Sequence, residues 1–527
     1  MNGDWAEYTA LKGVEPMSDK VLSVGKGALL LTVLGAVSQV LGFGYRVALS
    51  RLAGAQVMGL YQLVMPVYSV LLSLTAVGLT AAVSNLTSQY LALGNTRGAH
   101  QTLNTCLRIF FLLLIPLGTV VIIASDAISV TFLGDARTQL GLILLVPCVA
   151  LTGVENFHKH VFYGAGLIRP PAVVDLLEQL IRAGAVLGLL ICFLPQYPER
   201  VVGLIVAGMV VCEVFSSLTL CILYRRRLSR TGLRGPGEAA GVRRRRVAAI
   251  ALPVGANALL GNLMGAANAT LIPQKLVEGG MDRNAAIAQF GVVCGMTLPM
   301  LALPTVFLGA LNLVLVPRLA RASALGREGE VRRLTSRAMS AVAVLILPSM
   351  AMMVVLGPNL SQLLFAQPDA GSYLLPLAIT MTLSCFCSVL GGVLNGVGHQ
   401  RQVAVVSLLG GGVQLAFTLA LVPLPGVGMR GYIAGALVSA ALEAVLCLWL
   451  TVRSTGLVPQ WFSWLIAPGL ASLLASLTSN LLLHYLEQEG VSPLTCCGAS
   501  FIFGLILYLA ALHTQAVNVR EILRIHW

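Results

Sequence analysis

"VVDLLEQLIRAGAVLGLLICFL", residues Val173 to Leu194, is an apolar stretch long enough to cross a lipid bilayer as a helix. Its second half carries no charge, whereas its first half holds Asp175, Glu178 and Arg182. On a helix these three side chains form one stripe, because residues three and four apart face the same side. A charge at the centre of a bilayer costs at least about 2.5 kcal/mol, so we expect the stripe to face a partner or a wet cavity.

Apolar stretches of this kind recur along the whole chain of 527 residues, of which 57% are hydrophobic and 10% are charged. A soluble domain has about 25% charged residues, so this composition excludes a soluble protein of this size. The apolar runs are about 20 residues long and do not alternate with polar residues, which excludes the strands of a β-barrel. The sequence therefore predicts an all-α membrane protein with about 14 transmembrane helices.

Part of the opening stretch is duplicated. "AVVDLL" begins at Ala172 and "AVVSLL" begins at Ala404, which is 232 positions later (404 − 172). The same offset aligns Gly164 with Gly396, Gly166 with Gly398, Arg169 with Arg401, and Pro116 with Pro348. A repeat of six spans predicts two pseudo-symmetric six-helix bundles that enter the membrane in the same sense, followed by a C-terminal helix pair.

The distribution of charge gives the predicted domain boundaries and orientation. We expect an N-terminal tail at 1–23, the first bundle at 24–228, a basic linker at 229–246, the second bundle at 247–453, two further helices at 464–515, and a C-terminal tail at 516–527. With the N-terminus inside, 26 of the 34 lysines and arginines lie on the inward side and six on the outward side. This bias predicts a plasma-membrane protein with both termini in the cytoplasm. The linker is interpreted as a hinge-like joint because it contains Gly232, Gly235, Pro236 and Gly237.

Other features narrow the class of function. Retention of basic loops on the cytoplasmic face explains the net charge of +13 better than nucleic-acid binding does. The eleven cysteines lie mostly in apolar runs, without C-x-x-C or histidine at metal spacing, so they predict small core residues and no metal site. No Walker A, H-E-x-x-H or G-x-S-x-G motif is present, so we expect neither an enzyme nor a cofactor.

The repeat allows the charged stripe to be compared with the matching helix of the second bundle. The matched helix carries Ser407, Gly410 and Gln414 instead, so folding does not need the charges. We predict cation or proton coupling by the intramembrane acids, which are Glu155, Asp175, Glu178 and Glu213. Substrate binding in a central cavity is predicted for Arg46, Arg51, Arg182, Asn257 and Asn262. The alternatives are a purely structural Glu178–Arg182 pair, snorkelling of the two arginines of the first span, and helix packing by the asparagines.

The stretch "SQVLGFGYRVALSRLAGAQVMGLYQLVMPVYSVLLSLTAVGLTAAVSNLTSQYLALGN", Ser38 to Asn95, resembles the start of polysaccharide-exporter-type proteins of the multidrug/oligosaccharidyl-lipid/polysaccharide flippase superfamily. Within it, "SRLAGAQVMGLYQLVMPVYSV" is similar to the branch of stage V sporulation protein B. The resemblance implies flipping of an undecaprenyl-pyrophosphate-linked oligosaccharide or peptidoglycan precursor for spore-cortex or cell-wall synthesis. It implies a lipid-linked oligosaccharide or lipid II as substrate, with membrane lipids and cell-wall synthesis enzymes as partners.

"VLGF", at 40–43, and "SRLAGA", at 50–55, also resemble the MurJ-type lipid II flippases. Those flippases have arginines just before and after the first motif, where this chain has Gln39, Tyr45 and Arg46, so their headgroup-binding roles do not transfer directly. Two alternatives to a flippase remain open. One is a cation-coupled multidrug extruder of the same superfamily, and the other is a non-transporting scaffold for cell-wall enzymes.

Overall fold

The computed structural model describes residues 24–227 and 234–515, and every regular element in these ranges is helical. The predicted tails at 1–23 and 516–527 and the first linker residues lie outside the described residues. The main helices are α2 (Val24–Leu72), α3 (Gly78–Ala92), α4 (Thr96–Ile123), α6 (Gln139–Gly164), α7 (Arg169–Phe193), α8 (Val201–Arg227), α9 (Ala240–Glu278), α10 (Arg283–Phe290), α11 (Leu298–Ala302), α12 (Val306–Ala324), α13 (Glu328–Phe365), α14 (Leu374–Gly396), α15 (Gln400–Leu421), α16 (Met429–Thr455), α17 (Ala467–Gln488) and α18 (Pro493–Thr514).

Thirteen helices of the described chain are long and apolar enough to cross a membrane. The first, Val33–Ala92, has 60 residues, far more than the roughly 20 that one crossing needs. It is interrupted at Gly54, whose φ of 80° and ψ of 175° lie outside the helical region. Glycine adopts such a φ without the steric penalty of a Cβ atom. The helix therefore makes two crossings, and the prediction of about 14 spans is confirmed.

The duplication in the sequence is a duplication of structure. The matched residues Gly164 and Gly396 are the last residues of α6 and α14. Gly166 and Gly398 follow them with φ values of 71° and 92°, the left-handed geometry in which glycine ends helices. Helices α6 and α7 both pack against α8, as α14 and α15 both pack against α16. The prediction of two pseudo-symmetric bundles is confirmed.

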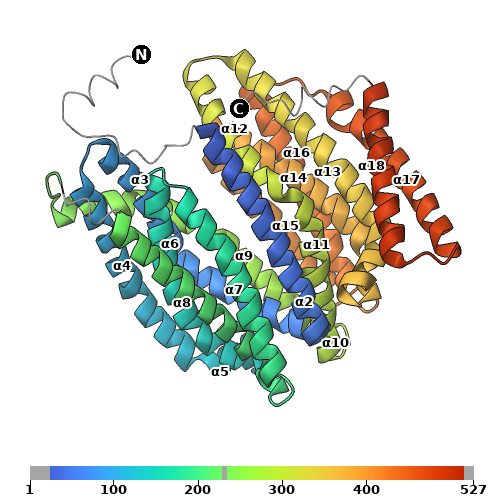
Figure 1. Ribbon diagram of the computed structural model, residues 1–527, viewed down its shortest axis with the longest axis horizontal. Helices are drawn as coiled ribbons and strands as arrows, with labels where there is room; N and C mark the ends of the chain where they lie inside the picture. Colours follow the sequence, from blue (N-terminus) through green and yellow to red (C-terminus); the bar gives the residue numbers. More distant parts are fainter. Residues whose placement is uncertain (1–23, 228–233, 516–527) are drawn as a thin grey trace.

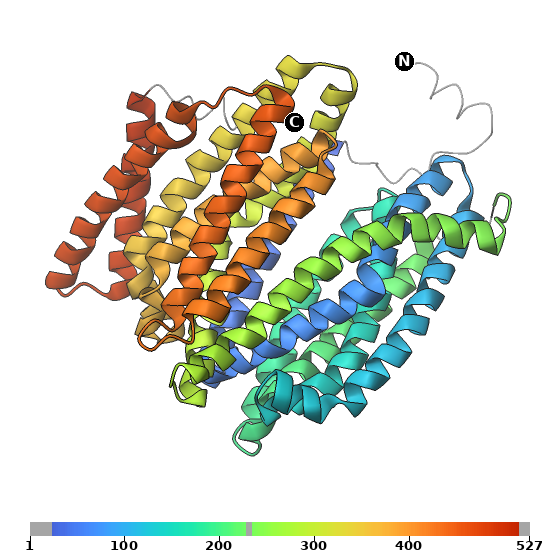
Figure 2. The ribbon, with the colours of Figure 1, turned by 180° about the vertical axis from the view of Figure 1, so that it is seen from behind.

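The two bundles meet along α2 and α9. Figures 1 and 2 show α3 to α8 in one group and α11 to α16 in another, with α17 and α18 at the outer edge. We call α2 to α8 the first half and α9 to α16 the second half. Each of the two boundary helices crosses over, because α2 packs against α10 and α12 while α9 packs against α3.

The C-terminal pair is an appendage of the second half. Helices α17 and α18 pack on α13, where the buried Tyr508 hydroxyl donates a hydrogen bond of 2.8 Å to the Val344 carbonyl. Their other faces carry exposed leucines such as Leu470, Leu477 and Leu481. An exposed apolar face on a spanning helix is suited to lipid contact.

The described part of the linker, from Arg234 onward, is attached to the first half. The Asn95 side-chain amide donates to the Pro236 carbonyl at 3.1 Å, and the Arg243 guanidinium donates to the Thr105 hydroxyl at 2.8 Å. These bonds hold the segment against the start of α4. The interpretation of the linker as a hinge-like joint stays a prediction.

Candidate functional site

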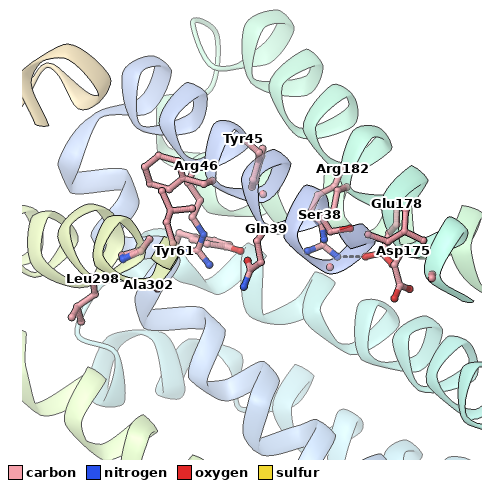
Figure 3. Close-up of a pocket in the computed structure, with 18 of the residues that line it drawn as sticks. Ser38, Gln39, Tyr45, Arg46, Tyr61, Asp175, Glu178, Arg182, Leu298 and Ala302 are labelled. Atoms are coloured by element: carbon pink, nitrogen blue, oxygen red, sulfur yellow. Dashed lines mark hydrogen bonds and ion pairs between the residues drawn. The ribbon is translucent and has the colours of Figure 1, made fainter. Parts of the chain in front are cut away.

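A cavity of about 720 Å³ lies between the two halves. Its walls come from α2, α6 and α7 on one side, and from α11, α14 and the π-helical turn Gly291–Thr297 on the other. Figure 3 shows Gln39 and Arg46 of α2 on one wall and Asp175, Glu178 and Arg182 of α7 on another. The structure thus brings the charged stripe of α7 and one predicted arginine of α2 into the same cavity.

The stripe on α7 forms because Asp175, Glu178 and Arg182 are three and four residues apart in one continuous helix, and all three line the cavity. Arg182 forms an ion pair with Glu178 on its own helix. The same guanidinium reaches Glu213 of α8, with Nη2 and Oε1 3.5 Å apart. Glu213 is 1% exposed and does not line the cavity, so Arg182 connects a buried acid to the cavity wall.

Lys159 of α6 is a central member of the site, although the sequence did not predict it as a site residue. Its Nζ lies 2.7 Å from a carboxylate oxygen of Glu155 and 2.7 Å from one of Asp175. The Ser216 hydroxyl of α8 donates to the other oxygen of Glu155 at 2.9 Å. Lys159 lines the cavity and Glu155 is buried behind it. The spacing of four residues between these two was a sequence signal for an ion pair on one helix face.

The acidic groups are close enough to share a cation. The donor atoms of Glu178, Cys212 and Glu213 lie within 4.8 Å of one another, and so do those of Glu155, Asp175 and Glu178. Basic side chains supply positive charge to both groups, since Arg182 reaches the first and Lys159 reaches the second. We call the set of six charged residues the charged cluster; its members are Glu155, Lys159, Asp175, Glu178, Arg182 and Glu213.

Arg46 differs from the other basic residues of the cavity. Lys159 and Arg182 are each paired with two carboxylates. No acidic side chain in the described ranges lies within 4.0 Å of the Arg46 guanidinium. An unpaired guanidinium facing a cavity can bind a phosphate or carboxylate through two parallel hydrogen bonds.

Three predicted substrate-binding residues do not line this cavity. Arg51 donates hydrogen bonds to backbone carbonyls at the end of α13, at residues 363 and 364. The Asn262 amide donates to the Ser73 hydroxyl, which packs α9 against the first half. Asn257 is exposed on α9. For Arg51 and Asn262 the contacts support the anchoring and packing alternatives.

A polar latch joins the two halves at the end of the molecule opposite the linker. Arg137 pairs with Asp135 at 2.6 Å and donates to the Asn284 side chain at the start of α10 at 3.1 Å. The Gln274 amide of α9 donates to the Phe132 carbonyl at 2.7 Å. Partial burial alone would raise the pKa of Asp135, but the hydrogen bonds and charge of Arg137 lower it below its usual value.

Replacing Arg137 by Gln is expected to destabilise the protein by about 1–3 kcal/mol near pH 7, because a partly buried carboxylate loses its partner. The carboxylate pairs only when ionised, so its contribution is complete above a pH of about 4 and disappears as the pH falls through the lowered pKa. Thermal unfolding in detergent between pH 7 and pH 3 measures this difference. The exposed Arg200 is the control, and equal losses for Arg137→Gln and Arg200→Gln would contradict the latch.

Comparisons with known proteins agree with this architecture. The family model of the polysaccharide biosynthesis proteins matches residues 24–322. Stage V sporulation protein B of Bacillus subtilis (strain 168) is 24% identical over 412 residues, which make up 77% of this chain and 79% of the relative. Sporulation protein YkvU of the same organism is 23% identical over 424 residues, or 78% of this chain and 91% of the relative.

Two kinds of solved transporter share the fold. The lipid II flippase MurJ in an inward closed conformation superposes with a TM-score of 0.69 at 10% identity, over 94% of this chain and 100% of that chain. An inward-facing multidrug resistance MATE family transporter of the MOP superfamily superposes with a TM-score of 0.65 at 14% identity, over 81% and 99%. The expected resemblance is confirmed. Because the family model covers more than half of the chain, the protein belongs to the polysaccharide biosynthesis protein family.

Proposed function

We propose that the protein is a flippase that moves a lipid-linked oligosaccharide or peptidoglycan precursor across the plasma membrane by alternating access. The observation that carries this proposal is the cavity between the halves, which places Arg46 beside neutral polar groups. A guanidinium suits the phosphate of such a substrate. The hydroxyl and amide side chains of Ser38, Gln39 and Gln179 suit the sugars, because they both donate and accept hydrogen bonds.

The comparisons support the substrate class and the cellular setting. Both relatives are named for sporulation, and one structure with the same fold is a lipid II flippase. On this basis the proposal includes a role in spore-cortex or cell-wall synthesis, with cell-wall enzymes as partners. The surplus of basic residues on one side supports an orientation with both termini in the cytoplasm.

The charged cluster is proposed to couple transport to a proton or another cation. It contains four carboxyl groups and only two basic groups, so full ionisation would leave excess negative charge within the membrane. One carboxylate oxygen from each of Glu155, Asp175 and Glu178 lies within 4.8 Å of the others. Binding of a proton or cation there would relieve the repulsion between the like charges. The surplus of carboxyl groups would allow the cluster to take up a proton or cation on one side of the membrane and to release it on the other.

Two alternatives are favoured by particular observations. The excess of acid and the fold shared with a MATE transporter favour a cation-coupled extruder of cationic drugs. The pairing of both cluster bases with acids favours a non-transporting scaffold. Arg46, which has no acidic partner in the described ranges, argues against both, because its charge would repel a cationic drug and a closed scaffold would leave that charge without a partner.

Reconstitution into vesicles separates the three functions. We expect vesicles containing the protein to expose a fluorescent lipid II or undecaprenyl-pyrophosphate oligosaccharide to an external quencher faster than protein-free vesicles do. A cationic dye should not move faster under the same proton or sodium gradient. Dye movement without lipid movement would establish an extruder, and movement of neither, in a folded sample, would support a scaffold. Vesicles containing the Glu213→Gln variant test the coupling. We expect that lipid transport by this variant no longer depends on the proton or sodium gradient.

A further inference from the structure

The ion pair between Lys159 and Asp175 differs from the other pairs of the charged cluster in its exposure to the cavity. Both residues line the cavity, and the Asp175 side chain is 35% exposed. The side chains of the other three acids are only 2–9% exposed; these are Glu155, Glu178 and Glu213. A carboxylate that leaves its base loses little free energy where water can hydrate it, and much more where it is buried. Asp175 is therefore the acid of the cluster that is most readily released from its base.

The second carboxylate on Lys159 does not depend on Asp175. Nζ of Lys159 lies 2.7 Å from one oxygen of Glu155, and the Ser216 hydroxyl donates to the other oxygen at 2.9 Å. The buried Glu155 thus keeps a base and a hydroxyl donor when Asp175 moves away. A lysine ammonium carries three N–H donors, so it can hold Glu155 and bind a second anion at the same time.

The repeat indicates that the fold does not require this pair. With the offset of 232, Lys159 corresponds to Gly391 (159 + 232) and Asp175 corresponds to Ser407 (175 + 232). Helices α14 and α15 pack on α16 without either charge. Bringing a lysine and an aspartate into a membrane-spanning bundle costs free energy, so a pair that helix packing does not need indicates a role in the cavity.

We infer that Lys159 is a second phosphate-binding residue of the cavity, and that Asp175 occupies its binding position until a phosphate arrives. The inference rests on the proposed function, in which the substrate is a lipid joined to its sugars through phosphate. An ammonium binds a phosphate oxygen at about 2.7–2.9 Å, and Oδ1 of Asp175 lies 2.7 Å from Nζ. In the exchange the phosphate replaces this carboxylate, which becomes hydrated within the cavity. Together with Arg46, Lys159 supplies the second positive charge that a diphosphate needs.

Binding of farnesyl diphosphate to the purified full-length protein tests this exchange, because the probe carries a diphosphate on a short isoprenoid chain. Calorimetry in detergent measures the affinity. Lys159→Gln should weaken binding at least about tenfold, since a charge-assisted contact is lost. Asp175→Asn should tighten binding at least about threefold, because the phosphate no longer has to displace a carboxylate. Farnesol, which has the same chain without phosphate, is the control ligand and should bind all variants alike.

The double variant Asp175→Asn/Lys159→Gln separates a specific exchange from a general effect of charge. Removing one negative charge from the cavity would favour any anion, and that effect would persist without Lys159. We expect instead that the gain from Asp175→Asn disappears in the Lys159→Gln background. If Lys159→Gln does not fold, Glu155→Gln/Lys159→Gln replaces it as the background, because the buried acid is then removed together with its base.

The inference is overturned if Asp175→Asn binds farnesyl diphosphate no more tightly than wild type, or if its gain persists without Lys159. Lipid transport by wild-type vesicles is measured separately. Transport of fluorescent lipid II without the gain in Asp175→Asn would overturn only the phosphate site at Lys159. A folded wild type that neither binds farnesyl diphosphate nor transports lipid would overturn the proposed function as well.

Discussion

Arg182→Gln is expected to reduce transport at least about tenfold, or about 1.4 kcal/mol, and to destabilise the folded protein by about 3 kcal/mol. The reason is that Arg182 serves two acids, Glu178 on its own helix and Glu213 on α8. Its removal leaves both without a base in a low-dielectric environment. Glu178→Gln should be milder, because Arg182 then keeps its contact with Glu213.

The double variant Glu178→Gln/Arg182→Gln separates folding from function. We expect it to recover much of the stability that Arg182→Gln loses, since an acid and a base are removed together. Transport should stay lost, because the cluster no longer connects Glu213 to the cavity. The measurements are thermal unfolding in detergent and lipid transport in vesicles, with both normalised to folded protein.

The exposed pair Glu328–Arg332 is the matched control, since it is an ion pair of the same four-residue spacing within one helix and does not line the cavity. Its double replacement by Gln should change stability by less than about 1 kcal/mol and leave transport intact. If Glu178→Gln/Arg182→Gln transports normally, the cluster is a structural ion pair and the proposed coupling is wrong.

The fold was predictable because its signals are local. Spans of about 20 apolar residues identify crossing helices one at a time. The duplication was readable because glycines at positions such as Gly166 and Gly398 end matched helices with a left-handed φ that other residues rarely adopt. The stripe on α7 was predictable because intramembrane charge is costly and therefore points to a cavity or partner.

The missed parts of the site depend on how helices pack. The pairing of Lys159 with Glu155 follows from their spacing, but its second contact with Asp175 exists only because α6 and α7 are neighbours. Asn262 was expected in the cavity, yet the packing of α9 turns it toward Ser73. No local pattern specifies these distances.

For Arg46 and Arg51, which lie on one helix, the sequence alone also did not tell which side chain faces the cavity. They are five residues apart, which places their side chains about 140° apart around a helix of 3.6 residues per turn. From the sequence both were candidates for the substrate. The structure directs Arg46 into the cavity and Arg51 toward the carbonyls at the end of α13. The packing of α2 against α7 in the first half and against α10 and α12 in the second half decides which of the two arginines faces the cavity.

Arg46→Ala should therefore reduce transport roughly 10- to 100-fold, which corresponds to the loss of a charge-assisted contact worth about 1.5–3 kcal/mol. Its thermal stability should stay near that of wild type, because no carboxylate is left unpaired. Arg46→Lys should recover only part of the activity, since an ammonium cannot grip a phosphate bidentately. Arg51→Ala is the matched control, with lower stability but normal transport for each folded molecule. Normal transport by Arg46→Ala would exclude it from substrate binding and place it among the anchoring residues of α2.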